Sequence, residues 1–259
     1  MSEYETINAE VGNGIGVLTM NRPESLIAVN EKMAFEIQSV LKNFSRDKDV
    51  RCVAITGCGR AFSAGQDLKE ISEGTSFSDL FKCRYNPTII LIAEMQKPVA
   101  ALINGVAAGA GMSISLACDF EIMSESAKLV QVFSRIGLVP DSGASFFLPG
   151  LVGRSKAFEL AALDGELSAD EALKLGIVNC VFHDEKFLDE SMKILGQFAN
   201  GPTKAYSLIK KMLNHSSGAS IEESLEYEVY LQEIASRTAD AREGIKAFVE
   251  KRPPSFRGK

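Results

Sequence analysis

The sequence predicts an α/β fold with mainly parallel strand pairing. Short apolar segments rich in β-branched residues alternate with segments of helical spacing up to about residue 130. Two of the apolar segments run into glycine-rich turns that open a helix. The last part of the chain carries helical patterns with little strand signal. Alternation of strands and helices favours a sheet with helices packed against it.

The first expected elements are a β-hairpin and a capped helix. Residues 6–11 and 15–20 form the hairpin, joined by the turn Gly12-Asn13-Gly14. Residues 30–44 carry apolar side chains at helical spacing, and Asn30 is the expected N-cap. The remaining expected strands are residues 51–56, 99–103, 120–123 and 128–130, with a helix that ends near residue 118.

The C-terminal part is expected to be helical. Capping boxes begin at Ser168 and Ser220, and the second opens an amphipathic helix towards Arg237. Residues 203–213 and 240–250 are also expected to be helical. We therefore divide the chain into a core (1–200) and a helical region (201–259). The apolar side chains Leu225, Val229, Leu231 and Ile234 must be covered by the core or by a neighbouring subunit.

Composition excludes several classes of protein. The chain has 259 residues and a net charge of −6, so a basic surface for nucleic acid is not expected. A local patch can still bind one phosphorylated ligand. The stretch from Pro98 to Cys118 is uncharged and long enough to span a membrane. It holds Asn104 and three glycines, which favours a strand, a turn and a helix instead, and no membrane partner is expected.

The cysteines and the N-terminus indicate a cytoplasmic protein. The cysteine count is five, and no pair has the spacing C-x-x-C, so neither a disulfide framework nor a zinc site is expected. We interpret all five as small buried apolar residues. The first ten residues are polar and acidic, which is unlike a signal peptide.

Three segments are candidates for chemistry, since zinc-protease, nucleophile-elbow, P-loop and dinucleotide motifs are missing from the sequence. Residues 60–68 and 104–112 each join a strand to a helix through glycines. Backbone N–H groups at such turns lack partners and can hold a polarised oxygen. Two such turns facing each other make an oxyanion hole; alternatively, each is only a tight turn that needs small residues.

The third segment, residues 136–144, places one acid among apolar residues. Burial would raise the pKa of Asp141 and suit it to act as a general base near neutral pH. The alternative is that Asp141 caps the following helix. Spacing alone leaves both interpretations open.

Four motifs together resemble the crotonase superfamily, also called the enoyl-CoA hydratase/isomerase family. They are Asn21-Arg22-Pro23, residues 61–68, residues 104–119, and residues 167–172 with 175–178. The resemblance implies a spiral of ββα units, a C-terminal trimerisation region and an acyl-CoA substrate, with no cofactor beyond that CoA and no metal. It implies a homotrimer or a dimer of trimers. It also implies an oxyanion hole made by the N–H groups of Gln66 and Ala110.

The resemblance further indicates which reaction is expected. The positions of the two hydratase glutamates hold Ser113 and Phe133, which cannot handle the protons of water addition. Asp141 occupies the position of the acid in double-bond isomerases. The strings around Ala110 and Asp141 are most similar to the branch that rearranges ring-epoxidised phenylacetyl-CoA. The alternatives are a hydratase that uses Asp141 alone, another crotonase-fold lyase, or a non-catalytic acyl-CoA-binding trimer.

The resemblance also implies the substrate contacts. Asp67 is expected to order its turn or to contact the purine. Phe133 and Phe146 are expected to exclude water, and residues 76–86 to select the acyl group. Ile27 stands where many relatives have Asn, so the contact of that loop with substrate is in question. The residues expected along the CoA path are Leu26, Ala28, Ala64 and Leu68.

Overall fold

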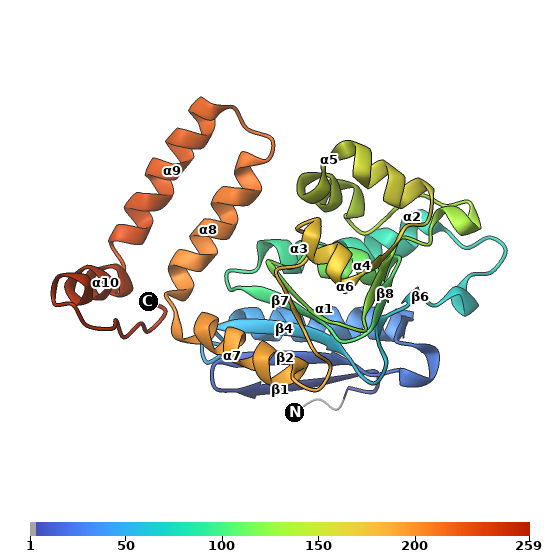
Figure 1. The fold of residues 1–259 in the computed structure, drawn as a ribbon, viewed down its shortest axis with the longest axis horizontal. Helices are drawn as coiled ribbons and strands as arrows, with labels where there is room; N and C mark the ends of the chain where they lie inside the picture. Colours follow the sequence, from blue (N-terminus) through green and yellow to red (C-terminus); the bar gives the residue numbers. More distant parts are fainter. Residues whose placement is uncertain (1–3) are drawn as a thin grey trace.

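The computed structural model describes residues 4–259 and contains a large mixed sheet with the strand order β1-β2-β4-β7-β9-β12 (Figure 1). Its first two strands form the predicted antiparallel hairpin, and the other neighbours pair in parallel. The α/β prediction is therefore confirmed. The strands are β1 (Ile7–Gly12), β2 (Ile15–Met20), β4 (Cys52–Gly57), β7 (Val99–Ile103), β9 (Phe120–Ser124) and β12 (Cys180–Phe182).

A second sheet, with the order β11-β10-β8-β5, lies beside the first and consists of very short strands. They are β5 (Ala61–Ser63), β8 (Val106–Ala108), β10 (Lys128–Val130) and β11 (Glu166–Ser168). Three times in succession the chain adds one strand to the large sheet, one to the small sheet, and then a helix. This repetition is the expected spiral of ββα units. A further parallel pair joins β3 (Ala28–Val29) to β6 (Gly65–Gln66).

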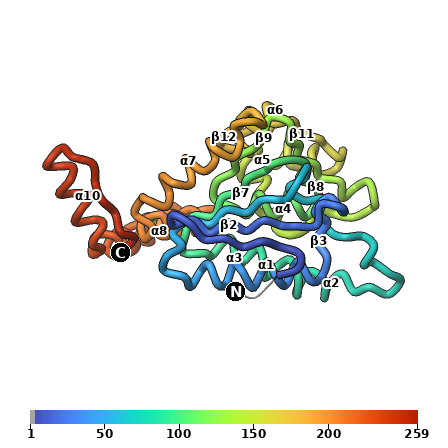
Figure 2. Tube along the Cα trace, turned by 90° about the horizontal axis from the view of Figure 1, so that it is seen from below, coloured from blue at the N-terminus to red at the C-terminus, as the bar shows by residue number. Residues whose placement is uncertain are grey.

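Helices cover both faces of the large sheet, because its strands are apolar on both sides. Val53 and Ile55 pack in the cluster that holds α1 (Glu31–Arg46), whereas Ala54 packs in the cluster with α7 (Phe187–Asn200). Figure 2 shows α1 and α7 on opposite sides of the strands. The other helices of the main body are α2 (Phe77–Leu80), α3 (Asn86–Glu94), α4 (Ala110–Leu116), α5 (Ala144–Ala162) and α6 (Ala169–Lys174).

Local capping signals are confirmed. The Asn30 side chain accepts a hydrogen bond of 2.9 Å from the Met33 N–H at the start of α1. Both predicted capping boxes form, at Ser168 and at Ser220. These bonds satisfy N–H groups that the first turn of a helix leaves without partners. Short 3₁₀ turns span Pro23–Ser25, Leu68–Glu70 and Ser134–Ile136, and Phe81–Tyr85 forms one turn of π-helix.

The last three helices extend away from the sheets, and α10 lies at one end of the molecule in both views (Figures 1 and 2). Leu231 is buried, but Leu225 and Val229 remain exposed, Val229 at 72%. The core of this chain therefore does not cover them. The division at residue 200 stays a prediction. The helices are α8 (Thr203–Ser216), α9 (Ile221–Ser236) and α10 (Ala239–Val249).

Two further expectations can be compared with the structure. Within residues 4–259, no helix is both long enough and apolar enough to cross a membrane. Residues 98–118 instead form β7, β8 and α4. All five cysteines are free, but the expectation that each is buried holds only for Cys52. Cys83 is exposed in the π-helical turn, and the other three are partly exposed.

Candidate active site

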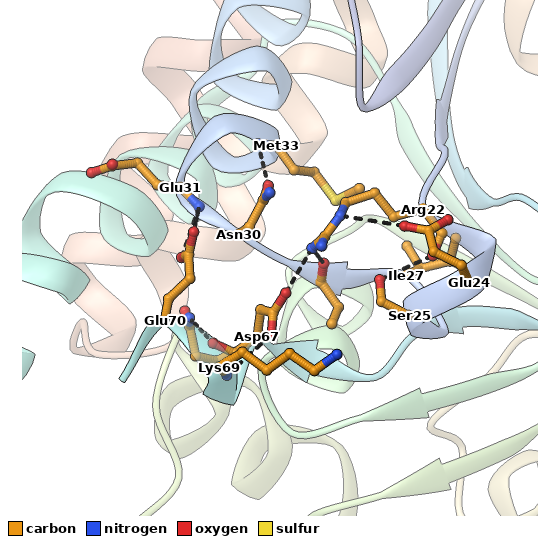
Figure 3. Close-up of polar contacts among 12 residues, drawn as sticks. Arg22, Glu24, Ser25, Ile27, Asn30, Glu31, Met33, Asp67, Lys69 and Glu70 are labelled. Atoms are coloured by element: carbon orange, nitrogen blue, oxygen red, sulfur yellow. Dashed lines mark hydrogen bonds and ion pairs between the residues drawn. The ribbon is translucent and has the colours of Figure 1, made fainter. Parts of the chain in front are cut away.

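The first predicted turn is held by its acid, Asp67. The Asp67 carboxylate accepts bonds from Arg22 Nη1 at 2.9 Å and from the Lys69 N–H at 3.2 Å (Figure 3). Asp67 is only 7% exposed. Burial raises the pKa of its carboxyl, but the bonds from Arg22 and the Lys69 N–H outweigh burial and hold the pKa below its usual value. These bonds order the turn next to Gln66, and a contact of Asp67 with the purine stays a prediction.

The two glycine-rich turns are in direct contact. Gly65 has a φ of +85°, and a Cβ there would lie 2.7 Å from the Ala108 carbonyl oxygen and 3.1 Å from the Ala110 nitrogen. A Cβ on Gly111 would collide with the carbonyl oxygen of Ser63. Ala110 is the first residue of α4, so the helix does not use its N–H. Glycine therefore brings the segments of Gln66 and Ala110 together, as an oxyanion hole requires.

The Gln66 side chain is bound at both ends of its amide. Its Oε1 accepts a hydrogen bond of 2.8 Å from the Tyr85 hydroxyl, and its Nε2 donates to the Asp67 carbonyl at 2.9 Å. Tyr85 is 1% exposed. Burial and, after it, the charge of Asp141 raise the pKa of the Tyr85 hydroxyl. Asp141 is therefore close to the residue that binds Gln66.

Asp141 is partly buried, as its proposed chemistry requires. Burial raises the pKa of its carboxyl from 3.8 to about 6, although a hydrogen bond of 2.7 Å from the Ser142 hydroxyl lowers it. The alternative that Asp141 caps the next helix is wrong. The N-cap of α5 is Gly143, and no side chain caps that helix. Ser142 and Gly143 both have positive φ, which turns the chain between Asp141 and α5.

The two positions that the resemblance assigns to the hydratase glutamates hold buried residues without a carboxyl group. Ser113 is fully buried, and its hydroxyl donates to the Gly109 carbonyl oxygen at 3.2 Å. Phe133 is 5% exposed, and its ring atoms lie 3.7 and 3.9 Å from where a Cβ on Gly109 would be. Phe133 therefore places hydrocarbon against the turn that precedes Ala110.

The structure brings most of the expected substrate-path residues together. The Ala64 N–H donates to the Leu26 carbonyl oxygen at 2.9 Å, and Ala28 pairs with Gly65. Leu68 comes after Asp67 in the same turn, and its side chain is exposed. Ile27 turns its side chain into the core at a φ of +58°, a strained conformation for a β-branched residue. In that position it offers no polar contact to a substrate.

Phe146 is not part of this cluster. It is 62% exposed and lines a groove that also holds Leu116 and Cys118. Leu116 ends α4, whereas Ala110 begins it, so this groove and the oxyanion turns lie at opposite ends of that helix.

One site residue, Tyr85, was missed by the sequence analysis. Residues 76–86 carried no pattern beyond a polar, irregular stretch. The available signal was Pro87 in the first turn of α3, which marks the helix start and puts Tyr85 just before it. In residues 4–259, no group of three or more His, Cys, Asp or Glu side chains is arranged to hold a metal ion.

Comparison with known proteins establishes the family. The family model described as enoyl-CoA hydratase/isomerase matches residues 10–259. The chain is 39% identical to the 1,2-epoxyphenylacetyl-CoA isomerase of Escherichia coli K12 over 98% of this chain and 99% of that protein. It is 36% identical to a "Probable enoyl-CoA hydratase" of Rhodobacter capsulatus, over 99% of both.

A solved structure agrees over the whole length. Enoyl-CoA hydratase subunit I from Geobacillus kaustophilus HTA426 superposes with a TM-score of 0.94 at 31% identity, covering 100% of both chains. The chain has the crotonase fold and belongs to the enoyl-CoA hydratase/isomerase family. It is an enzyme of that family, and the choice between isomerase and hydratase depends on the residues of its own site.

Proposed function

We propose that this enzyme is an acyl-CoA double-bond isomerase in which Asp141 moves a proton from C2 to C4. The carrying observation is the partly buried Asp141 carboxyl, whose pKa burial raises to about 6. Ser113 and Phe133 at the hydratase positions support the same choice, because neither can activate water. The similarity to an epoxyphenylacetyl-CoA isomerase also favours it.

The proposed mechanism divides the work between main-chain donors and one acid. The thioester oxygen accepts hydrogen bonds from the N–H groups of Gln66 and Ala110, and one such donor typically stabilises a transition state by roughly 3 kcal/mol. Asp141 removes the C2 proton, and the electron pair delocalises onto the thioester oxygen as an enolate. Asp141 then returns the proton at C4, which moves the double bond from C3–C4 to C2–C3. The carboxylate is regenerated, so one acid is sufficient.

The proposed substrate contacts follow the same cluster. Leu26, Ala28, Ala64 and Leu68 are proposed to contact the adenine and pantetheine parts of CoA; the closeness of Leu26, Ala28 and Ala64 and the exposure of Leu68 support this path. The reaction needs no cofactor beyond the CoA of the substrate. The acyl group is proposed to be a linear 3-enoyl chain, to which the transfer from C2 to C4 applies. The alternative is a ring-epoxidised phenylacetyl group, for which the same acid and donors would serve a ring rearrangement instead of that transfer.

We also propose a homotrimer, or a dimer of trimers, that acts in the cytoplasm. The exposed apolar side chains Leu225 and Val229 on α9 support assembly, since exposed apolar surface favours burial against another subunit. Five free cysteines support a reducing compartment. Sedimentation equilibrium of the purified protein measures the number of subunits.

The decisive experiment compares two substrates and two variants. Wild type should isomerise 3-hexenoyl-CoA and should not hydrate crotonyl-CoA, with a rate that rises with pH through about 6 as Asp141 ionises. Asp141→Asn should lower kcat by about 10³-fold while acyl-CoA still binds. The control is Asp170→Asn, an exposed acid in α6, which should leave kcat unchanged.

Three outcomes would contradict the proposal. Full activity in Asp141→Asn would remove the acid from the mechanism. Hydration of crotonyl-CoA without isomerisation would indicate a hydratase. Binding of acyl-CoA without turnover of either substrate or of a ring-derived thioester would indicate a non-catalytic binder.

A further inference from the structure

The buried tyrosine at the end of the π-helical turn has no role in the mechanism above. Building on the proposed isomerase, we propose that Tyr85 is a positioning residue: its hydroxyl holds the Gln66 side chain and thereby fixes the Gln66 N–H donor. Tyr85 is 1% exposed, so it acts through Gln66 rather than on the substrate. The 2.8 Å bond from its hydroxyl to Gln66 Oε1 carries the inference.

The bond matters because it completes the restraint on Gln66. The other end of the same amide donates to the Asp67 carbonyl, and Arg22 holds the Asp67 carboxylate. With Tyr85 in place, both polar atoms of the Gln66 side chain have partners inside the protein. The Gln66 side chain is then held at both of its polar atoms, which limits movement of the main-chain N–H of the same residue towards or away from the thioester oxygen.

Tyr85 is itself held firmly, which a residue that positions another requires. Gln38 of α1 donates from Nε2 to the carbonyl oxygens of Cys83 and Arg84, at 2.9 and 3.1 Å. Arg84 also forms ion pairs with Glu70 at 2.6 Å and Glu31 at 3.1 Å. Glu70 in turn accepts the first N–H of α1 (Figure 3). The π-helical turn is therefore tied to α1 through the two residues that precede Tyr85, and π-helical turns are frequent at functional sites.

The surroundings keep the Tyr85 hydroxyl in its donating form. Burial and the nearby Asp141 charge both disfavour a phenolate, so the hydroxyl keeps its proton and donates to Gln66 Oε1. Burial raises the pKa of Asp141 and the Ser142 hydroxyl lowers it, whereas the Tyr85 hydroxyl donates its hydrogen bond to Gln66. Removing the hydroxyl alone should therefore change the donor side of the site and leave the acid unchanged. If Tyr85 only filled space, the substitution would not affect the donor side while leaving the acid side unchanged.

The test is a double-mutant cycle with Tyr85→Phe and Gln66→Met, which retains the main-chain N–H. Tyr85→Phe should lower kcat by about tenfold, the effect of one hydrogen bond, with KM changed less than about twofold. Gln66→Met should give a similar loss, and the double variant should be no slower than the slower single variant. The acid limb of the pH–rate profile should stay at about 6. The control is Tyr206→Phe, whose ring packs on Phe198 in α7 and which should keep wild-type kcat.

A second readout does not depend on isomerase activity. Acetoacetyl-CoA forms an enolate whose ultraviolet band reports hydrogen bonding at the thioester oxygen, and Tyr85→Phe should weaken binding of that enolate by about tenfold. Wild-type kcat and enolate binding in Tyr85→Phe would overturn the inference, and so would losses that add in the double variant. An acid limb shifted towards 4 with reduced thermal stability would indicate that the tyrosine only excludes water. Normal enolate effects without isomerisation by wild type would instead overturn the proposed function.

Discussion

Gln66 and Asp141 both lie close to Tyr85, but the chain holds them in different ways. The Gln66 donor is a main-chain group, placed by the contact of Gly65 with α4 and by bonds from Tyr85 and to Asp67. The acid is a single side chain with one hydrogen bond, from Ser142, and burial sets its pKa. The donor side therefore depends on close packing of backbone, whereas the acid side depends on exclusion of water. Different substitutions should damage each side.

Apart from the loss of kcat already expected for Asp141→Asn, the largest expected effect is on the donor side, from Gly65→Ala. A methyl group there meets the Ala108 carbonyl oxygen at 2.7 Å, so the two turns must separate. We expect kcat to fall by about 10²-fold, since a shift of about 1 Å in a catalytic group has that effect. The control is Gly74→Ala, which has the same left-handed φ but nothing within 4 Å. Equal losses of kcat in both variants would show that φ, and not the close approach, is responsible.

The next effect is on the acid side and concerns stability. Here the substitution should increase the free energy of unfolding instead of damaging the protein. The native pKa of Asp141 is raised from 3.8 to about 6, so its ionised form costs stability above pH 6, and the cost disappears as pH falls towards 4. Two pKa units correspond to about 3 kcal/mol, and partial exposure reduces this to about 2 kcal/mol. Asp141→Asn should therefore raise the free energy of unfolding at pH 8, measured by urea titration.

The same titration at lower pH provides the control for Asp141→Asn. The stability gain should shrink steadily between pH 6 and pH 4, because wild type then carries a neutral acid as well. A variant less stable than wild type at pH 8 would contradict the interpretation that burial raises this pKa.

The smallest effect should come from Ser142→Ala. The Ser142 hydroxyl lowers the pKa of Asp141, so its removal should move the acid limb of the pH–rate profile above 6. The rate at pH 8 should change less than about threefold, because Asp141 is then ionised in both proteins. The exposed neighbour Ser145, replaced by alanine, is the matched control. An unchanged or lowered limb would mean that the Ser142 bond does not act on the reactive form of the acid.

Much of the fold was predictable because its signals are local. The hairpin of β1 and β2, the Asn30 cap and the capping boxes at Ser168 and Ser220 depend on residues within a few positions of one another. Of the four three-residue strands in the small sheet, β10 was predicted, but β5, β8 and β11 were not, because they lie in or beside turns and segments so short show no periodic pattern. They pair only with strands distant in the sequence.

The site was predictable in part. Glycine at positions 65 and 111 indicated backbone segments that need close approach, and the contacts with Ala108 and Ser63 supply the reason. Whether Asp141 caps a helix or lies in a partly buried site could not be decided from spacing. The positive φ of Ser142 and Gly143 decides it, because these residues delay the start of α5 to Ala144.

Residue types and their order were enough to predict an α/β chain with two donor turns and one candidate acid. They were not enough to predict that Tyr85 binds Gln66 or that Phe146 lies away from Ala110. They were also not enough to decide whether Asp141 is buried, which is what raises its pKa. Those properties depend on the distances between segments that are far apart in the chain and on how much water the packed segments exclude. Only the folded arrangement sets both quantities.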